Sequence, residues 1–118
     1  MGGVVMDGET AETLAGVVRL LRRGGRLAWV RAEVEGPRSP RQLVALGIDL
    51  AAEVARNLLP DGVEMTGPTP IGDDPVGLLR SAEQLLRTIT GVPAAGDAAR
   101  LRVRVTDLVG EANTSAGG

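Results

Sequence analysis

The sequence predicts an all-α protein, a small four- or five-helix bundle with an aliphatic core. Apolar residues recur at helical spacing along most of the chain. Two segments open with the start signals of helices, Ser39-Pro40 and Asp74-Pro75. Aromatic residues make up only 1% of the composition, so the core must be built from Leu, Val, Ala and Ile. The length of 118 residues allows one domain of ordinary size.

The first predicted helix covers residues 10–23. Its inward face follows the i, i+3, i+4, i+7 rule, and Gly24-Gly25 is expected to end it. Residues 26–35 fit a helical stripe but also alternate as a strand does. A lone strand would have no partner, so the helix is favoured. The apolar face of residues 10–23 consists of Leu14, Val17, Val18 and Leu21.

Residues 40–59 form the clearest predicted helix. Ser39 is a natural N-cap, Pro40 fits the first position, and Gln42 completes a capping box. Pro60 and the residues after it end the helix. Because its polar residues lie within an arc of about 100°, we expect this helix to be covered on most sides, at the centre of the bundle or in a subunit interface. The polar residues are Gln42, Asp49, Glu53, Arg56 and Asn57.

Two more helices are predicted after a connection at 63–73. The first covers 74–90, is capped by Asp74 and has a wide apolar face. The second covers 97–112 with Asp97 as its cap, although residues 101–105 also alternate as a strand would. The domain is expected to span 9–112, with a flexible N-terminus at 1–8 and a flexible C-terminal tail at 113–118.

The composition excludes most common types of catalytic site and metal site. The chain has no Cys, His, Lys or Tyr. It therefore lacks a thiol nucleophile, a histidine base, a Ser–Lys pair and the usual zinc ligands. The adjacent carboxylates Asp73 and Asp74 are explained by helix capping. These absences argue against an enzyme, and we expect neither a cofactor nor a metal site.

Charge and hydropathy narrow the possible partners. A net charge of −2 argues against nucleic acid, which normally requires a basic face. No segment is long and apolar enough to span a bilayer, and we expect that the first six residues are not a secretory signal. The chain has thirteen Arg, no Lys and much Ala and Gly, which is typical of a GC-rich bacterial genome. We therefore expect a bacterial protein located in the cytoplasm.

The leading functional hypothesis is a non-enzymatic interaction or scaffolding module. The helices at 40–59 and 74–90 carry more apolar perimeter than a chain of this length can cover. We therefore expect a homodimer or higher homo-oligomer, while a different protein partner is also compatible with the pattern. The candidate interface residues are Leu46, Leu50, Leu58, Leu78 and Leu85.

The alternative is a regulator that binds a small ligand or nucleic acid through a basic patch. Residues 19–31 contain five Arg and no acidic residue, with Trp29 among them. Guanidinium groups beside an indole can hold an anion or a stacked base. The competing interpretation, which we favour, is a solvated face with one Trp in the core or an interface. The candidate patch is Arg22, Arg26, Trp29 and Arg31, and any pocket is expected to be lined with Leu and Val and to open near Trp29.

Overall fold

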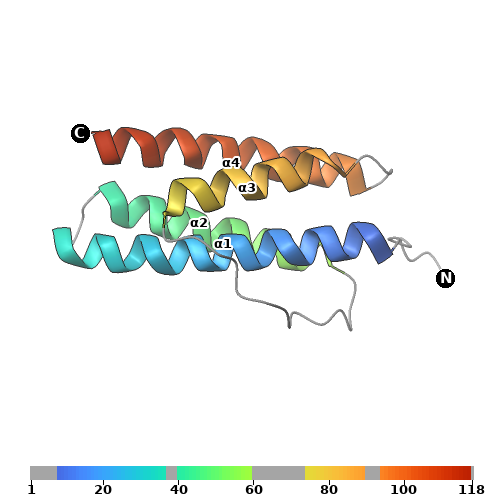
Figure 1. Cartoon of the computed structure of the whole chain (residues 1–118), viewed down its shortest axis with the longest axis horizontal. Helices are drawn as coiled ribbons and strands as arrows, with labels where there is room; N and C mark the ends of the chain where they lie inside the picture. Colours follow the sequence, from blue (N-terminus) through green and yellow to red (C-terminus); the bar gives the residue numbers. More distant parts are fainter. Residues whose placement is uncertain (1–7, 37–39, 60–73, 90–93, 118) are drawn as a thin grey trace.

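The computed structural model describes residues 8–36, 40–59, 74–89 and 94–117. Within these ranges the regular structure consists of four α-helices, drawn in Figure 1. This confirms the predicted all-α bundle of four or five helices, of which the described residues form four. The helices are α1 (Gly8–Glu35), α2 (Pro40–Asn57), α3 (Pro75–Arg87) and α4 (Ala94–Gly117).

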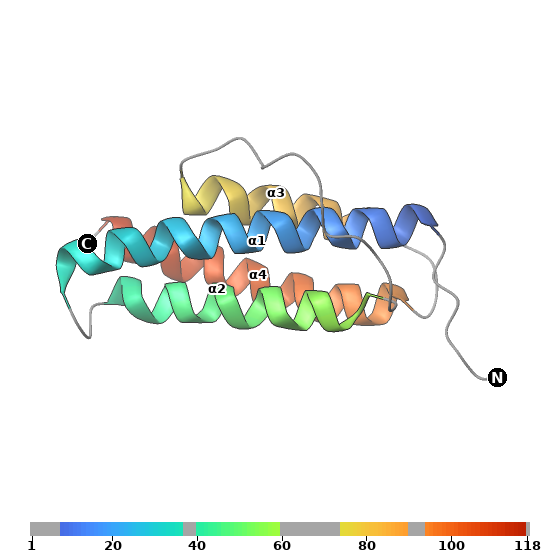
Figure 2. The ribbon, with the colours of Figure 1, turned by 90° about the horizontal axis from the view of Figure 1, so that it is seen from below.

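The four helices lie side by side in an elongated bundle that measures 49 × 25 × 22 Å. Helix α1 packs against α2 and α3, and α4 packs against the same two helices. Helices α2 and α3 therefore lie across one diagonal and run in the same direction, while α1 and α4 run the opposite way (Figures 1 and 2). Each helix is thus antiparallel to both of its neighbours.

The prediction that Gly24-Gly25 ends the first helix is wrong, because α1 continues through both residues to Glu35. The helical interpretation of residues 26–35 is confirmed. Each glycine costs about 1 kcal/mol in helix propensity, but both are buried where neighbouring helices approach. A Cβ at Gly24 would lie 3.6 Å from the Cβ of Leu78 on α3, and one at Gly25 would overlap the carboxylate of Asp49 on α2.

The actual end of α1 is a left-handed glycine. Gly36 has a φ of +99°, and its N–H donates to the carbonyl oxygen of Ala32 at 3.1 Å. A glycine at this position ends many helices because it adopts positive φ without a steric penalty. Pro37, the next residue in the sequence, cannot continue a helix.

The two best-marked helices form close to the predicted bounds. Helix α2 begins at Pro40 as expected, and the predicted cap Ser39 lies outside the described residues. Asp74 is the N-cap of α3 as predicted: its side chain accepts a hydrogen bond from the backbone N–H of Val76 at 3.3 Å. Pro75 then occupies the first helical position, where its missing N–H is no loss.

Helix α4 is longer than predicted at both ends. It begins at Ala94, so Asp97 lies within the first turn and is not the cap. It continues to Gly117, and the expected tail therefore belongs to a helix up to that residue. The strand interpretation of residues 101–105 is wrong. At the other terminus, Gly8 of the expected flexible segment 1–8 is the first residue of α1, and residues 1–7 lie outside the described part of the chain.

The core is aliphatic, as the composition predicted. Helices α1, α3 and α4 contribute leucine and valine side chains to it. Helix α2 contributes mainly alanine to the core, together with the larger side chains of Val44 and Ile48. The largest fully buried side chains are Leu14, Leu21, Ile48, Leu79, Leu108, Val17, Val18 and Val105.

Candidate functional site

The outer face of α2 carries an exposed row of large apolar side chains, here named the α2 stripe. Its four members are between 48% and 70% exposed. They are spaced by three, four and four residues, which places them within an arc of about 80° and along about 16 Å of helix. The α2 stripe consists of Leu43, Leu46, Leu50 and Val54.

Large and small apolar side chains on α2 are distributed in the opposite way to those of a simple surface helix. A helix that only rests on its own core turns its larger apolar side chains inward and polar ones outward. The inward face of α2 instead holds Ala45, Ala51, Ala52 and Ala55 beside its two larger residues. Three leucines and a valine point away from the bundle. This distribution is typical of a helix that packs on two sides.

Helix α3 does not share this exposure. Its apolar face, including Leu78 and Leu79, is buried between α1 and α4. The sequence had suggested that Leu78 is part of a contact surface. It instead belongs to the core of a single copy. Leu85 is half-buried against the same core. The apolar face of α3 is wide, but both of its neighbours are in place to cover it.

The five predicted interface residues thus separate into three groups. Leu46 and Leu50 lie on the α2 stripe, Leu58 is half-buried at its end, and the two α3 leucines are in or against the core. Sequence reasoning missed Leu43 and Val54, although both continue the spacing of Leu46 and Leu50 and could have been found by extending it.

One border of the α2 stripe is formed by α4, and two hollows lie along this border. The first is lined by Leu50 and Val54 from the stripe, with Arg100 and Arg104 from α4. Asp97 also lines this hollow.

The second hollow lies toward the other end of the stripe, beside Leu43. From α4 it is lined by Asp107 and Glu111, together with neutral residues. The α4 border of the stripe therefore changes from mainly basic to acidic along its length.

The predicted basic patch is divided by the fold. Arg22, Arg26 and Trp29 lie within an arc of about 60° on α1, whereas Arg31 is about 160° away from Trp29. Arg31 forms an ion pair with Asp74, with Nη1 and Oδ1 3.6 Å apart. The structure therefore brings together three of the four residues and places Arg31 against α3.

Trp29 forms part of the contact between α1 and α2. Its indole N–H donates a hydrogen bond to the carboxylate of Asp49, and its ring is half-buried against the core. Gly25 lies one helical turn before Trp29 and leaves the space that this carboxylate occupies. The indole N–H of Trp29 and the buried part of its ring thus already have partners within the chain.

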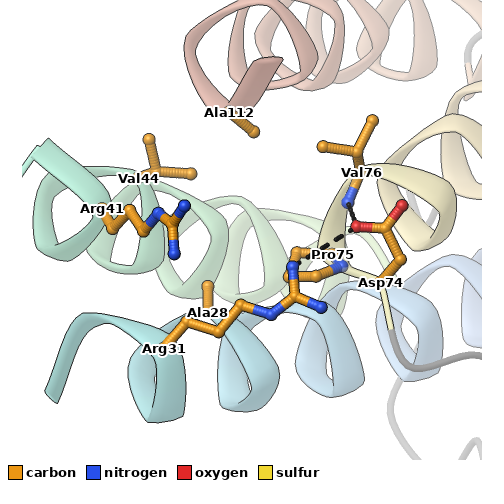
Figure 3. Close-up of a pocket in the computed structure, with 8 residues that line it drawn as sticks. All are labelled: Ala28, Arg31, Arg41, Val44, Asp74, Pro75, Val76 and Ala112. Carbon is orange, nitrogen blue, oxygen red and sulfur yellow. Dashed lines mark hydrogen bonds and ion pairs between the residues drawn. The ribbon is translucent and has the colours of Figure 1, made fainter. Parts of the chain in front are cut away.

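A small pocket opens at the end of the bundle where the short helix α3 begins (Figure 3). Its walls are Ala28, Val44, Pro75, Val76 and Ala112, and its polar residues are Arg31, Arg41 and Asp74. The space amounts to about 50 Å³, room for only a few water molecules. Val44 and Val76 agree with the expected lining, but no leucine lines this pocket and Trp29 is not part of it. A separate hollow does open at Trp29, where its other walls are Ala32, Glu33, Gly36 and Gln42. Asp74 is occupied by Arg31 and by the Val76 N–H.

The described residues contain no cluster of three or more side chains that could ligate a metal ion. None of the helices in the described part of the chain is both long and apolar enough to cross a bilayer. Comparison with protein families, with curated proteins and with solved structures finds no match for this chain.

Proposed function

We propose that this protein is a non-enzymatic helical interaction module that self-associates through the α2 stripe. The observation that carries the proposal is the size distribution on α2, with alanine facing the core and leucine facing outward. A second copy on this face would give α2 packed neighbours on both sides. The geometry of the α2 stripe supports this role better than the basic patch supports ligand binding, because the Trp29 indole and Arg31 are engaged within the chain.

The expected strength of association follows from the exposed area. Full burial of one aliphatic side chain contributes about 1.5–3 kcal/mol, so covering the four roughly half-exposed side chains of each copy, eight in a dimer, contributes about 6–12 kcal/mol. Association costs at least about 4 kcal/mol in translational and rotational freedom. The α2 stripe alone would therefore support a dimer with a Kd of about 1 μM at best. A stable dimer requires further contacts from the borders of the stripe.

A second copy fits the α2 stripe better than an unrelated partner does. Anchors in heteromeric interfaces are commonly Trp, Tyr and Arg, and the stripe contains none of them. Its aliphatic composition resembles half of a domain core, as obligate homodimer interfaces do. A partner of another sequence is one of the outcomes that the following experiment can detect.

The test compares two substitutions of similarly exposed residues. Leu50 is 52% exposed on the α2 stripe, and Val103 is 57% exposed on the outer face of α4. We expect Leu50→Glu to be folded by circular dichroism and monomeric by sedimentation, while the wild type and Val103→Glu sediment as dimers. The wild type sedimenting as a monomer at about 100 μM, far above a micromolar Kd, would contradict the proposal and point to another partner. If Leu50→Glu and Val103→Glu have the same oligomeric state, the α2 stripe is not the dimer interface.

A further inference from the structure

The α4 border of the α2 stripe contains two pairs of like charges. Arg100 and Arg104 are four residues apart, and so are their acidic counterparts Asp107 and Glu111. Like charges at this spacing weaken an isolated helix. All four side chains are exposed, and none forms an ion pair within the described part of the chain. Within a single copy the nearest opposite charges stand three residues away on α4, Asp97 before Arg100 and Asp107 after Arg104, and neither forms an ion pair with its neighbour.

The two pairs lie at opposite ends of the α2 stripe. The arginines line the hollow beside Leu50 and Val54, where Asp97 reduces the net charge to +1. The acidic pair lines the hollow beside Leu43, where the net charge is −2. Each copy thus presents a mainly basic half and an acidic half along one edge of the same apolar surface.

A two-fold axis that pairs α2 antiparallel with its copy would also place α4 opposite α4, running in the reverse direction. Arg100 would then face Glu111 of the other copy when the axis crosses α4 between Val105 and Thr106. The same axis position brings Arg104 opposite Asp107. One axis position therefore neutralises both like-charge pairs in both copies.

The same position can be located on α2 by an independent contact. Gly47 lies against Leu108, because a Cβ on this glycine would be 2.6 Å from Cδ2 of that leucine. Helices α2 and α4 are antiparallel. A point two to three residues before Leu108 on α4 therefore corresponds to a point two to three residues after Gly47 on α2. The axis required by the charges thus crosses α2 beside Leu50, within the apolar stripe.

A parallel arrangement does not achieve this match. An axis that runs along the helices would place α4 of the two copies on opposite sides of the paired α2 helices. The arginines and the carboxylates of α4 would then face no complementary row, and only apolar contacts along α2 would remain.

We infer that two copies pair antiparallel through the α2 stripe about a two-fold axis near Leu50, with Arg100 and Arg104 of each facing Glu111 and Asp107 of the other. This inference rests on the proposed self-association and adds its orientation and register. The apolar stripe provides the contact area, while the charges of α4 select one arrangement.

Single cysteines test the orientation, because these 118 residues contain none. Under oxidation, Leu50→Cys is expected to cross-link to its own copy. Leu43 lies seven residues from the axis, about 21 Å from its symmetry mate, so Leu43→Cys is not expected to cross-link to itself. A mixture of Leu46→Cys and Val54→Cys is expected to form the mixed disulfide. Efficient self-cross-linking of Leu43→Cys would show parallel pairing and overturn the inference, while leaving self-association intact.

Charge reversal tests the register. We expect Arg100→Glu/Arg104→Glu and Asp107→Arg/Glu111→Arg each to raise the dimer Kd about tenfold, and an equimolar mixture of the two to restore wild-type affinity. Arg80→Glu/Arg87→Glu, on α3 across the bundle, makes the same change in net charge as Arg100→Glu/Arg104→Glu and is expected to leave the Kd unchanged. The inference fails if the mixture remains as weak as its components, or if both variants match the α3 control. A wild type that sediments as a monomer would instead refute the proposed function.

Discussion

Helices α2 and α3 look alike in sequence but differ in what they leave exposed. Both have apolar residues over much of their perimeter, and both pack against α1 and α4. On α3 the large leucines point into the core, and the outward face is polar. On α2 the buried residues are mainly alanine, and the large side chains of the α2 stripe point outward.

This comparison shows that the width of an apolar arc does not identify the face that a helix buries. Side-chain size is more informative, because a close helix–helix contact requires small residues. On an exposed face, packing places no limit on the size of the side chain. Gly47 on α2 and its contact with Leu108 illustrate the close approach. Leucines on the open side of such a helix then indicate a second surface.

The largest expected effect is on α3. Leu79 is fully buried, so Leu79→Ala removes core contacts and leaves a cavity. We expect the free energy of unfolding to fall by about 2–5 kcal/mol, measured by urea denaturation at low protein concentration. A loss below about 1 kcal/mol would show that α3 is not part of a tightly packed core.

A smaller effect is expected at the contact between α2 and α4. Gly47→Ala would push a methyl group into the buried Leu108 side chain, and we expect a net loss of about 1–2 kcal/mol despite the better helix propensity.

Gly110→Ala is the matched control for this contact. No atom lies within 4 Å of a Cβ at Gly110, so the same substitution there should stabilise the chain by about 0.5–1 kcal/mol. Thermal denaturation of the two variants measures the difference, and a stabilised Gly47→Ala variant would contradict the close packing of α2.

The start of α3 provides the next prediction. Asp74→Ala removes the N-cap hydrogen bond to Val76 and the exposed ion pair with Arg31. We expect a loss of about 1 kcal/mol, most of it from the cap. Asp74→Asn keeps a capping side chain and should recover most of this loss. Denaturation curves that do not distinguish the two variants would exclude the capping role.

The smallest effect on a single copy is expected on the α2 stripe itself. Leu46→Gln exchanges one exposed side chain for another, so the unfolding free energy of the monomer should change by less than about 0.5 kcal/mol. Dimer affinity should nevertheless fall. A large loss of monomer stability at high dilution would show that Leu46 belongs to the core, as Leu79 does.

The fold could be predicted from the sequence where local signals and packing agree. Asp74-Pro75 marks the start of α3 correctly because capping is a local interaction. The Gly24-Gly25 pair was misleading because these glycines make room for α2 and α3, which approach α1 there. The tertiary contacts override the low helix propensity of glycine. The true end at Gly36 has its signal in the following Pro37.

The candidate site was predicted only in part for a related reason. Periodicity shows that Leu46 and Leu78 are apolar positions on helices, but not which neighbours cover them. Only the packing shows that α1 and α4 bury Leu78 and leave Leu46 exposed. Likewise, Arg31 and Trp29 are close in sequence, but residues two apart on a helix point in different directions. Arg31 therefore contacts Asp74, whereas Trp29 contacts Asp49.

The most direct test of the proposed second surface is the mass of the wild-type chain in solution as a function of concentration. Sedimentation equilibrium should give about 24 kDa, twice the chain mass of 12.2 kDa, at high concentration and a reversible decrease on dilution. A constant mass of 12.2 kDa up to several hundred micromolar would contradict the account, because the α2 stripe would then remain uncovered.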